Sequence, residues 1–180
     1  MDDNRAWFWD SKIQSRNNGL SQLWLLRCLA PLLLAVLVCV PAAAQCTAYV
    51  TAHKSNNVVV VDTFLDRVVA VIPVQIQPLA VAITPNGALV YVANSASNTV
   101  SVIGTATNAV MTTVTVTWAP DGVATTPDGA FAYVTNEFAN TLSVVDTTTN
   151  TVVDTVQGVA TFPVGIAIMH SSNMPTLKCR

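Results

Sequence analysis

Few side chains of this sequence are suited to catalysis, and none has catalytic or metal-binding spacing. His53 has no second histidine or carboxylate at ligand spacing, which favours a solvated loop residue over a metal ligand. Glu137 has no neighbouring carboxylate in sequence, and only folding could bring Asp121 or Asp154 close to it. Acid and base catalysis usually needs two differently tuned groups. The sequence therefore predicts no enzyme, no metal and no cofactor.

Known catalytic motifs are absent as well. The sequence has no nucleophile elbow, phosphate-binding loop, dinucleotide fingerprint, paired-cysteine motif, haem-attachment site or Asp-rich calcium loop. Its net charge is −2 and it carries no basic patch, which argues against nucleic acid as a partner. With 52% hydrophobic and 10% charged residues, the chain has the composition of a folded protein rather than a disordered one.

Amides and aromatic rings are the remaining side chains that could bind a ligand. Asn94 and Asn136 could do so, but we expect them to bond local backbone at a strand end. Trp118 and Phe162 could stack on a sugar or a base. We expect these two rings to pack between structural units instead, because large aromatic side chains usually supply buried apolar area.

These residues belong to a repeat with a period of 42 residues. Tyr49, Tyr91 and Tyr133 stand in similar runs, and both of their spacings (91 − 49 and 133 − 91) equal 42. A fixed period of this size indicates one supersecondary unit copied in tandem, because one unit alone cannot bury its apolar face. The elements of this unit must position any functional side chain.

Each period contains short runs rich in Val, Ile, Thr and Ala, which predict four antiparallel strands a, b, c and d. The predicted strands are 79–83, 122–125 and 164–168 for a; 48–51, 90–94 and 132–136 for b; 57–61, 99–103 and 141–145 for c; 68–72, 110–114 and 152–156 for d. Asn-Gly at 86–87 and Asp-Gly at 128–129 close the a-to-b hairpins. Four strands in about 40 residues match a β-propeller blade, with a flat solenoid or sandwich as the alternative.

One repeat resembles a known family. The run Tyr-Val-Thr-Asn at 133–136, followed by 140–146 and preceded by Thr-Pro-Asp-Gly at 126–129, resembles the YVTN-family β-propeller repeat. The resemblance covers Ala48 to about Ile168. It implies an all-β fold of about three four-stranded antiparallel blades, forming an open arc or partial propeller. The first repeat departs from the pattern, with Ala52 where Asn is expected.

The resemblance says little about activity. Such repeats occur in secreted and cell-surface proteins of bacteria and archaea, including surface-layer proteins. Similar blades serve as non-catalytic binding scaffolds and, in related propellers, as lactonases and redox-enzyme subunits. The resemblance therefore implies a cell-envelope or secreted setting without naming a ligand.

Residues 1–44 have the order of a secretory signal. An apolar run of 13 residues (28–40) follows Arg27 and precedes Pro-Ala-Ala-Ala at 41–44, so we expect a signal helix cleaved after Ala44. The run is shorter than the roughly 20 residues that span a bilayer. An uncleaved membrane anchor is the alternative, because Leu23 to Leu26 extend the apolar stretch. The predicted organisation is a signal at 1–44, three repeats at 45–169 and a tail at 170–180, in a secreted, periplasmic or cell-surface protein.

Cys46 and Cys179 would remain after cleavage. Export permits a disulfide between them that ties the ends of the repeat array together. Two unpaired thiols near the termini are an equal alternative. A lipid-modified Cys46 ranks last, because Gln45 occupies a position where such signals usually carry a small residue.

The b-to-c and d-to-a loops of an antiparallel blade emerge on one face. These loops vary between the copies, whereas the opposite turns are nearly constant, so any ligand should meet the variable face. The ligand-face candidates are His53, Asn94, Trp118, Asn136, Glu137 and Phe138.

Three repeats are fewer than the roughly 4 to 8 blades of known propellers. An open arc exposes strand edges and invites association. Two chains could pair head to tail into a six-bladed ring, each supplying strand a to the other. The favoured interpretation is the front part of a longer reading frame, because the tail from His170 to Arg180 does not resemble the next hairpin.

Three functional hypotheses follow. The leading one is an exported, non-enzymatic β-propeller scaffold that binds a protein or a cell-envelope polymer, with membrane contact only through an uncleaved N-terminal segment. The alternative is a fragment of a propeller enzyme or redox subunit, lactonase-like or quinoprotein-like, whose site lies in missing blades. A non-functional remnant is the third.

Overall fold

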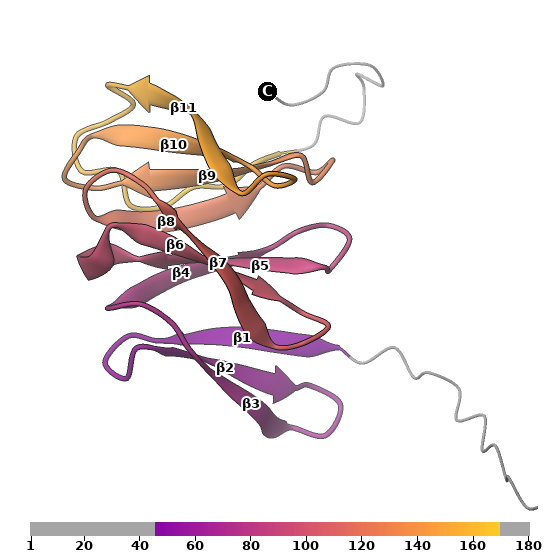
Figure 1. Cartoon of the computed structure of the whole chain (residues 1–180). Coiled ribbons are helices and arrows are strands. Elements are labelled where there is room, and N and C mark those ends of the chain that lie inside the picture. The colour runs from indigo at the N-terminus through magenta and orange to yellow at the C-terminus, as the bar shows by residue number, and fades with distance from the viewer. Residues whose placement is uncertain (1–45, 170–180) are drawn as a thin grey trace, which may run out of the picture. The chain divides into compact units, whose positions relative to one another are not determined.

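The computed structural model describes residues 46–169, which form three antiparallel β-sheets in chain order (Figure 1). The first sheet has the order β1-β2-β3, the second β4-β5-β6-β7 and the third β11-β10-β9-β8. The predicted signal at 1–44, the tail at 170–180 and Cys179 lie outside the described residues.

The strands follow the repeat closely. The first sheet contains β1 (Thr47–Ala52), β2 (Asn57–Asp62) and β3 (Arg67–Pro73). The second contains β4 (Pro78–Ile83), β5 (Leu89–Asn94), the short 3-10 helix η1 (Ser95–Ser97), β6 (Thr99–Gly104) and β7 (Ala109–Thr115). The third contains β8 (Pro120–Thr125), β9 (Phe131–Asn136), β10 (Thr141–Asp146) and β11 (Thr151–Gln157). The predicted strands b, c and d are confirmed in all three units, and strand a in the second and third.

The predicted strand at 164–168 is wrong. No strand forms there in the structure, because a β-strand needs a hydrogen-bonded neighbour and no following strand b exists among residues 46–169. The segment 163–169 instead lies against the third sheet. The hydroxyl of Thr135 donates a hydrogen bond of 2.9 Å to the Val164 carbonyl.

The a-to-b turns form as their sequences predict. Gly87 and Gly129 adopt positive φ values of 69° and 72°, which glycine accepts without steric cost. The hydroxyls of Thr84 and Thr126 donate to the Asn86 and Asp128 side chains at 2.7 and 2.6 Å. These bonds fix the reversal of the chain and therefore the register of each hairpin.

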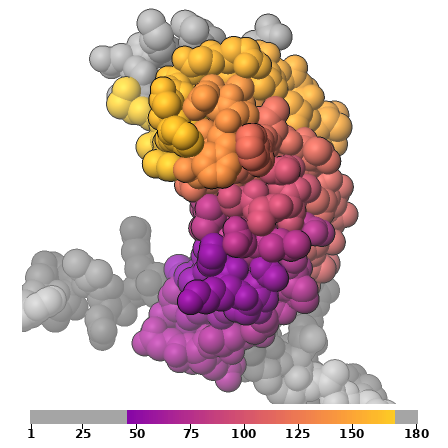
Figure 2. Space-filling view, turned by 90° about the vertical axis from the view of Figure 1, so that its left-hand side faces the viewer, coloured from indigo at the N-terminus to yellow at the C-terminus, as the bar shows by residue number. Residues whose placement is uncertain are grey.

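Two apolar layers hold the three sheets face to face. Val58, Val60 and Ile72 of the first sheet pack against Val90, Val92 and Ile103 of the second. Tyr91, Val100, Val102 and Val114 of the second pack against Val123, Ala132, Val134 and Val145 of the third. Burying each such aliphatic side chain contributes roughly 1.5–3 kcal/mol to folding. The units are thus separate sheets stacked on one another, as blades are, and the same order is seen from the side (Figure 2).

The recurring tyrosine joins the first sheet to the second, and the second to the third, by a hydrogen bond that we call the tyrosine clasp. The Tyr49 hydroxyl donates to Oδ1 of Asn108 at 2.9 Å, and the Tyr91 hydroxyl donates to Oδ1 of Asn150 at 2.7 Å. Each bond joins strand b of one sheet to the c-to-d turn of the following sheet, across 59 residues. Burial raises the pKa of Tyr91 to about 12, with a smaller contribution from the Asp146 carboxylate.

Candidate binding face

Two sets of loops meet at one end of the sheets, which we call the loop face. The first set joins strand b to strand c (53–56, 95–98 and 137–140), and the second leaves strand d (74–77, 116–119 and 158–162). Oδ1 of Asn56, Asn98 and Asn140 accepts a hydrogen bond from the backbone N–H of Gln77, Ala119 and Phe162, at 3.0, 2.9 and 2.9 Å. These bonds bind the two loop sets together, so both emerge on the same face.

Three aromatic side chains, Trp118, Phe138 and Phe162, form an aromatic cluster on the loop face. The ring centroids of Trp118 and Phe138 lie 5.4 Å apart with an interplanar angle of 76°. Those of Phe138 and Phe162 lie 5.9 Å apart at 86°. Edge-to-face contacts of this kind stabilise aromatic pairs by roughly 0.5–1.5 kcal/mol.

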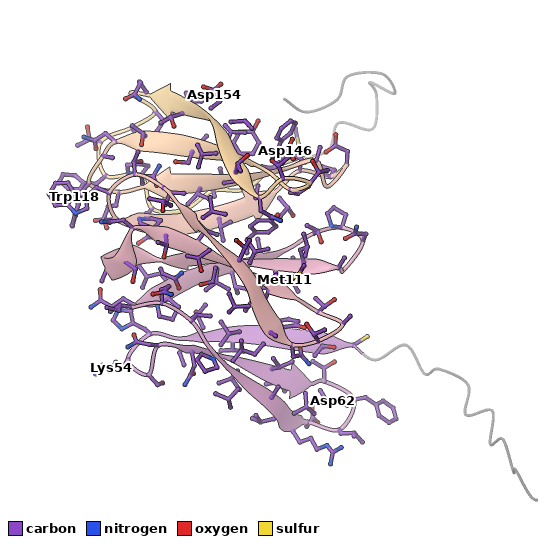
Figure 3. All side chains as sticks on the ribbon, in the orientation of Figure 1. Lys54, Asp62, Met111, Trp118, Asp146 and Asp154 are labelled. Carbon is purple, nitrogen blue, oxygen red and sulfur yellow. The ribbon has the colours of Figure 1, made fainter. Side chains whose placement is uncertain are left out.

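The aromatic cluster is exposed to solvent. Trp118 is 62% exposed, Phe138 47% and Phe162 58%. Our expectation that Trp118 and Phe162 pack between units is wrong, because both side chains are mostly exposed in loops and each makes its ring contact with Phe138. Figure 3 shows Trp118 projecting at the same end as Lys54, whereas Asp62 and Asp146 lie at the opposite end.

The backbone of Phe162 is held in a left-handed conformation with φ of 52°. That region costs a non-glycine residue on the order of 1 kcal/mol. Gln77 and Ala119, the equivalent residues of the earlier units, adopt φ values of 57° and 55°. The bond from Asn140 therefore imposes a conformation common to the repeat, and in this unit it positions an aromatic ring.

The other predicted candidates take different places. Asn94 and Asn136 are fully buried, and their Nδ2 atoms donate to Oγ of Ser101 and Ser143, each at 2.9 Å. They join strand b to strand c mainly through these side chains, although Nδ2 of Asn136 also donates to the Thr141 carbonyl at 3.5 Å, and they do not reach the surface. His53 is exposed in the first b-to-c loop.

Glu137 is half-buried between the cluster and the third sheet. Its backbone N–H donates to the Ala119 carbonyl at 2.8 Å, which ties the residue before Phe138 to the residue after Trp118. The structure thus brings Trp118, Glu137 and Phe138 together from the six predicted candidates. Phe162 completes the cluster, and its alignment with Gln77 and Ala119 was the sequence signal that could have placed it there.

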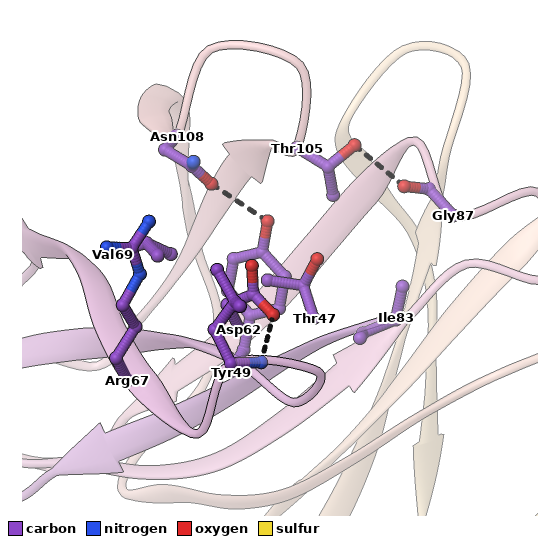
Figure 4. A pocket seen from close by; sticks show the side chains of 10 residues that line it. Thr47, Tyr49, Asp62, Arg67, Val69, Ile83, Gly87, Thr105 and Asn108 are labelled. Atoms are coloured by element: carbon purple, nitrogen blue, oxygen red, sulfur yellow. Dashed lines mark hydrogen bonds between the residues drawn. The ribbon is translucent and has the colours of Figure 1, made fainter. Parts of the chain in front are cut away.

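A cavity of about 600 Å³ lies between the first two sheets at the end opposite the loop face (Figure 4). The polar side chains of Tyr49, Asp62 and Asn108 in its lining are already engaged within the fold. Asp62 accepts hydrogen bonds from the backbone N–H groups of Phe64 and Leu65 at 2.9 and 3.0 Å, and the Tyr49 hydroxyl is bonded to Asn108. We therefore regard this cavity as part of the contact between the first two sheets, beside the tyrosine clasp, and not as a ligand site.

The described residues offer little for metal chemistry. Within 46–169, no three His, Cys, Asp or Glu residues are grouped so as to hold a metal ion. Over the same range, no helix is long and apolar enough to cross a membrane. Cys46 is exposed and unpaired among these residues, and its pairing with Cys179 stays a prediction.

Comparison with known proteins gives the fold. No protein-family model and no curated protein matches the chain. Among solved structures, Kuenenia stuttgartiensis hydrazine synthase matches with a TM-score of 0.65 and 30% identity, over 66% of this chain and 34% of that one. The WD40 repeats of RRP9 match at 0.58 and 18%, over 62% and 35%. Dihydro-heme d1 dehydrogenase NirN in complex with DHE matches at 0.56 and 20%, over 61% and 24%.

The chain spans about a third or less of the length of these structures. WD40 repeats form β-propellers whose blades are four-stranded sheets. The second and third units have four antiparallel strands, and the first has three of them. The described part of the chain is therefore all-β and built of stacked β-propeller blades.

Proposed function

We propose that this chain is an exported, non-enzymatic β-propeller scaffold of the YVTN type, which binds a protein or a cell-envelope polymer through the aromatic cluster. The observation that carries the proposal is the meeting of three exposed rings from three different loops, Trp118, Phe138 and Phe162. Exposed apolar clusters on folded proteins mark interaction sites, and Trp is enriched among the residues that dominate binding energy.

The rings stand on a rigid frame. The residue after Trp118 is held at both backbone groups: the Ala119 N–H donates to Asn98, and its carbonyl accepts from the Glu137 N–H. The Phe162 N–H is held by Asn140 in the same way. Side chains positioned in advance lose little conformational entropy on binding, so more of the contact energy appears as affinity.

The chemistry of the cluster favours an apolar ligand surface. Ring faces and edges match the apolar face of a sugar ring, or a proline or aliphatic side chain of a peptide. Glu137, the charged residue beside the cluster, is half-buried. The exposed rings therefore supply most of the surface that a ligand would contact. The predicted signal at 1–44 and the YVTN resemblance support an envelope setting for such a ligand.

Trp118 provides a direct binding assay. The other three tryptophans, Trp7, Trp9 and Trp24, precede the predicted cleavage site, so Trp118 is the single tryptophan of the processed chain. We expect its emission to change on titration with envelope polysaccharide or with solubilised envelope protein, and the chain to be retained on the same fraction when immobilised. No change and no retention with either fraction would contradict the proposal.

Variants of the cluster make the assay specific. Retention should weaken at least about tenfold in Trp118→Ala and in Phe138→Ala, since residues that dominate an interface contribute about 2 kcal/mol or more. Ile76→Ala is the matched control, because Ile76 is the equivalent of Trp118 in the first unit and is 53% exposed. Equal loss in Ile76→Ala would place the binding surface elsewhere.

The competing function, a piece of a propeller enzyme or redox subunit, makes a different prediction. Two of the matched structures are named as a synthase and a dehydrogenase, which keeps this alternative in view. Mass analysis of the purified full-length product would then find a retained metal or quinone. The scaffold proposal predicts none.

A further inference from the structure

The first sheet and the segment 163–169 are incomplete in complementary ways. The first sheet begins with β1 at its edge, whereas the second and third begin with an inner strand, β4 or β8. The segment 163–169 follows the third sheet as β4 follows the first, but has no strand beside it among the described residues. One end of the described chain thus has a free edge, and the other has a segment of the matching type.

The segment is already held as an inner strand is held. The bond from the Phe162 N–H to Asn140 repeats those of Gln77 with Asn56 and Ala119 with Asn98. The bond from the Thr135 hydroxyl to the Val164 carbonyl repeats the 2.9 Å bond from Thr51 to the Leu79 carbonyl of β4. The segment therefore lies against the third sheet in the place that the inner strand of a following blade would take.

The residues of the segment suit a defined register. In β4 and β5, Pro78 pairs with Asn94, Val81 with Val92, Ala82 with Tyr91 and Ile83 with Val90. In β8 and β9, Pro120, Val123, Ala124 and Thr125 pair with Asn136, Val134, Tyr133 and Ala132. The corresponding residues are Pro163, Ile166, Ala167 and Ile168 in the segment, and Ala52, Val50, Tyr49 and Ala48 in β1. Proline, an aliphatic residue and alanine thus recur at the same positions.

The outer face of the first sheet is one that the other sheets bury. Val50 is 50% exposed, whereas its equivalents Val92 and Val134 are fully buried against the preceding sheet. Val71, on the same face, is 56% exposed and adds apolar area there, although its equivalent in the second sheet, Thr113, is exposed as well. This apolar surface has the character of a blade face that another blade covers.

The outer face of the third sheet has the reciprocal character. Val156 is 41% exposed, whereas its equivalents Ile72 and Val114 are buried against the following sheet. The first sheet offers the face that normally meets a preceding blade, and the third offers the face that normally meets a following one. The two surfaces are therefore matched by the internal repeat itself.

We propose that two copies of this chain pair head to tail, with the segment 163–169 of each copy forming the inner strand beside β1 of the other. The third sheet of one copy then packs on the first sheet of the second copy, and the arrangement closes with two-fold symmetry. The three blades described for each copy make six in the pair, within the roughly 4 to 8 of known propellers. This inference does not depend on the proposed binding function.

The pairing also continues one backbone bond of the repeat. The N–H groups of Ser95 and Glu137 bind the carbonyls of Gln77 and Ala119, and the N–H of His53 is placed to bind the Phe162 carbonyl of the second copy in the same way.

Cysteine cross-linking between copies tests the register. Full-length chains with all four natural cysteines replaced by serine carry either Val50→Cys or Ile166→Cys, and one of the two bears a mass tag. Residues paired across antiparallel strands lie within disulfide distance. We expect mild oxidation of the mixture to link the two chains, and the second pair, Ala48→Cys with Ile168→Cys, to do the same.

Gly165→Cys mixed with Val50→Cys is the control. A Cβ at Gly165 meets no atom within 4 Å, so the change is tolerated, but its side chain points to the opposite face of the segment. We expect at least tenfold less cross-linking from this pair. Absence of cross-links from both in-register pairs, with each chain folded by circular dichroism, would overturn the proposal, and so would equal linking in the control.

Discussion

The tyrosine of each repeat acts through its hydroxyl as well as its ring. The ring of Tyr91 belongs to the apolar layer between the second and third sheets, while its hydroxyl is bonded to Asn150. A buried hydroxyl left without a partner costs about 1–3 kcal/mol, so this position couples packing to one specific acceptor. The same logic applies to Tyr49 and Asn108.

The pKa of Tyr91 predicts a loss of stability in alkali. The phenol is neutral in both states below its ordinary pKa of 10.0, but in the folded state burial, with help from Asp146, raises that pKa to about 12. As pH rises through 10 the unfolded chain releases the proton first, so stability present below pH 10 falls as pH approaches 12.

Urea unfolding at several pH values between 9 and 12 measures this loss. We expect Tyr91→Phe to be about 0.5–1.5 kcal/mol less stable than the natural chain at neutral pH, because the hydrogen bond to Asn150 is lost. Above pH 10 its stability should fall less steeply than that of the natural chain. Parallel curves for the two proteins would show that Tyr91 does not titrate in this way.

At the scale of elements, the segment 163–169 depends on one glycine of β8. An ideal Cβ added at Gly122 would lie 2.3 Å from the Val164 carbonyl oxygen and 2.9 Å from Oγ1 of Thr135. No side chain fits there while the segment stays in place. The equivalent residue of the second unit is Ala80, which packs against the apolar layer between the second and third sheets.

Gly122→Ala should therefore displace the segment. We expect a loss of about 1–3 kcal/mol of stability, as for other overpacked sites, and faster hydrogen exchange at the amides of 164–168 by mass spectrometry. Gly165→Ala is the control, since a Cβ there meets nothing within 4 Å. If Gly122→Ala leaves the exchange of these amides unchanged, the segment is not held against β8 as described.

The sequence predicts most of the fold because the elements depend on local patterns. Val-rich runs, the period of 42 residues and the Asn-Gly and Asp-Gly turns place eleven strands in three sheets. The segment 164–168 shows the limit of this reasoning: its pattern matches β4 and β8, yet it forms no strand, because a strand also needs a partner that local sequence does not supply.

The candidate site was harder to predict. The tyrosine clasp joins residues 59 positions apart, which no local pattern reveals. The sequence predicted that Trp118 and Phe138 lie in loops at the same end of the sheets, as the structure has them, but exposure of Trp118 and Phe162 depends on how far each loop extends past its strands. Asn94 and Asn136 were predicted at the ends of strand b, whereas their burial follows from Ser101 and Ser143 on the neighbouring strand.

At the scale of the whole molecule, the described blades form a stack with two open and complementary ends. Val50 at one end and Val156 at the other are apolar and exposed, although Val92, the equivalent of Val50, and Ile72 and Val114, the equivalents of Val156, are buried. An apolar surface of this kind on a folded protein needs a cover. The internal repeat indicates that a second copy fits both ends at once.

Light scattering on the purified full-length chain tests this account most directly. We predict a mass of two copies for the natural chain, and of one copy for a Val50→Lys, Val71→Lys variant that stays folded by circular dichroism. A natural chain that is folded and has the mass of a single copy would contradict the account.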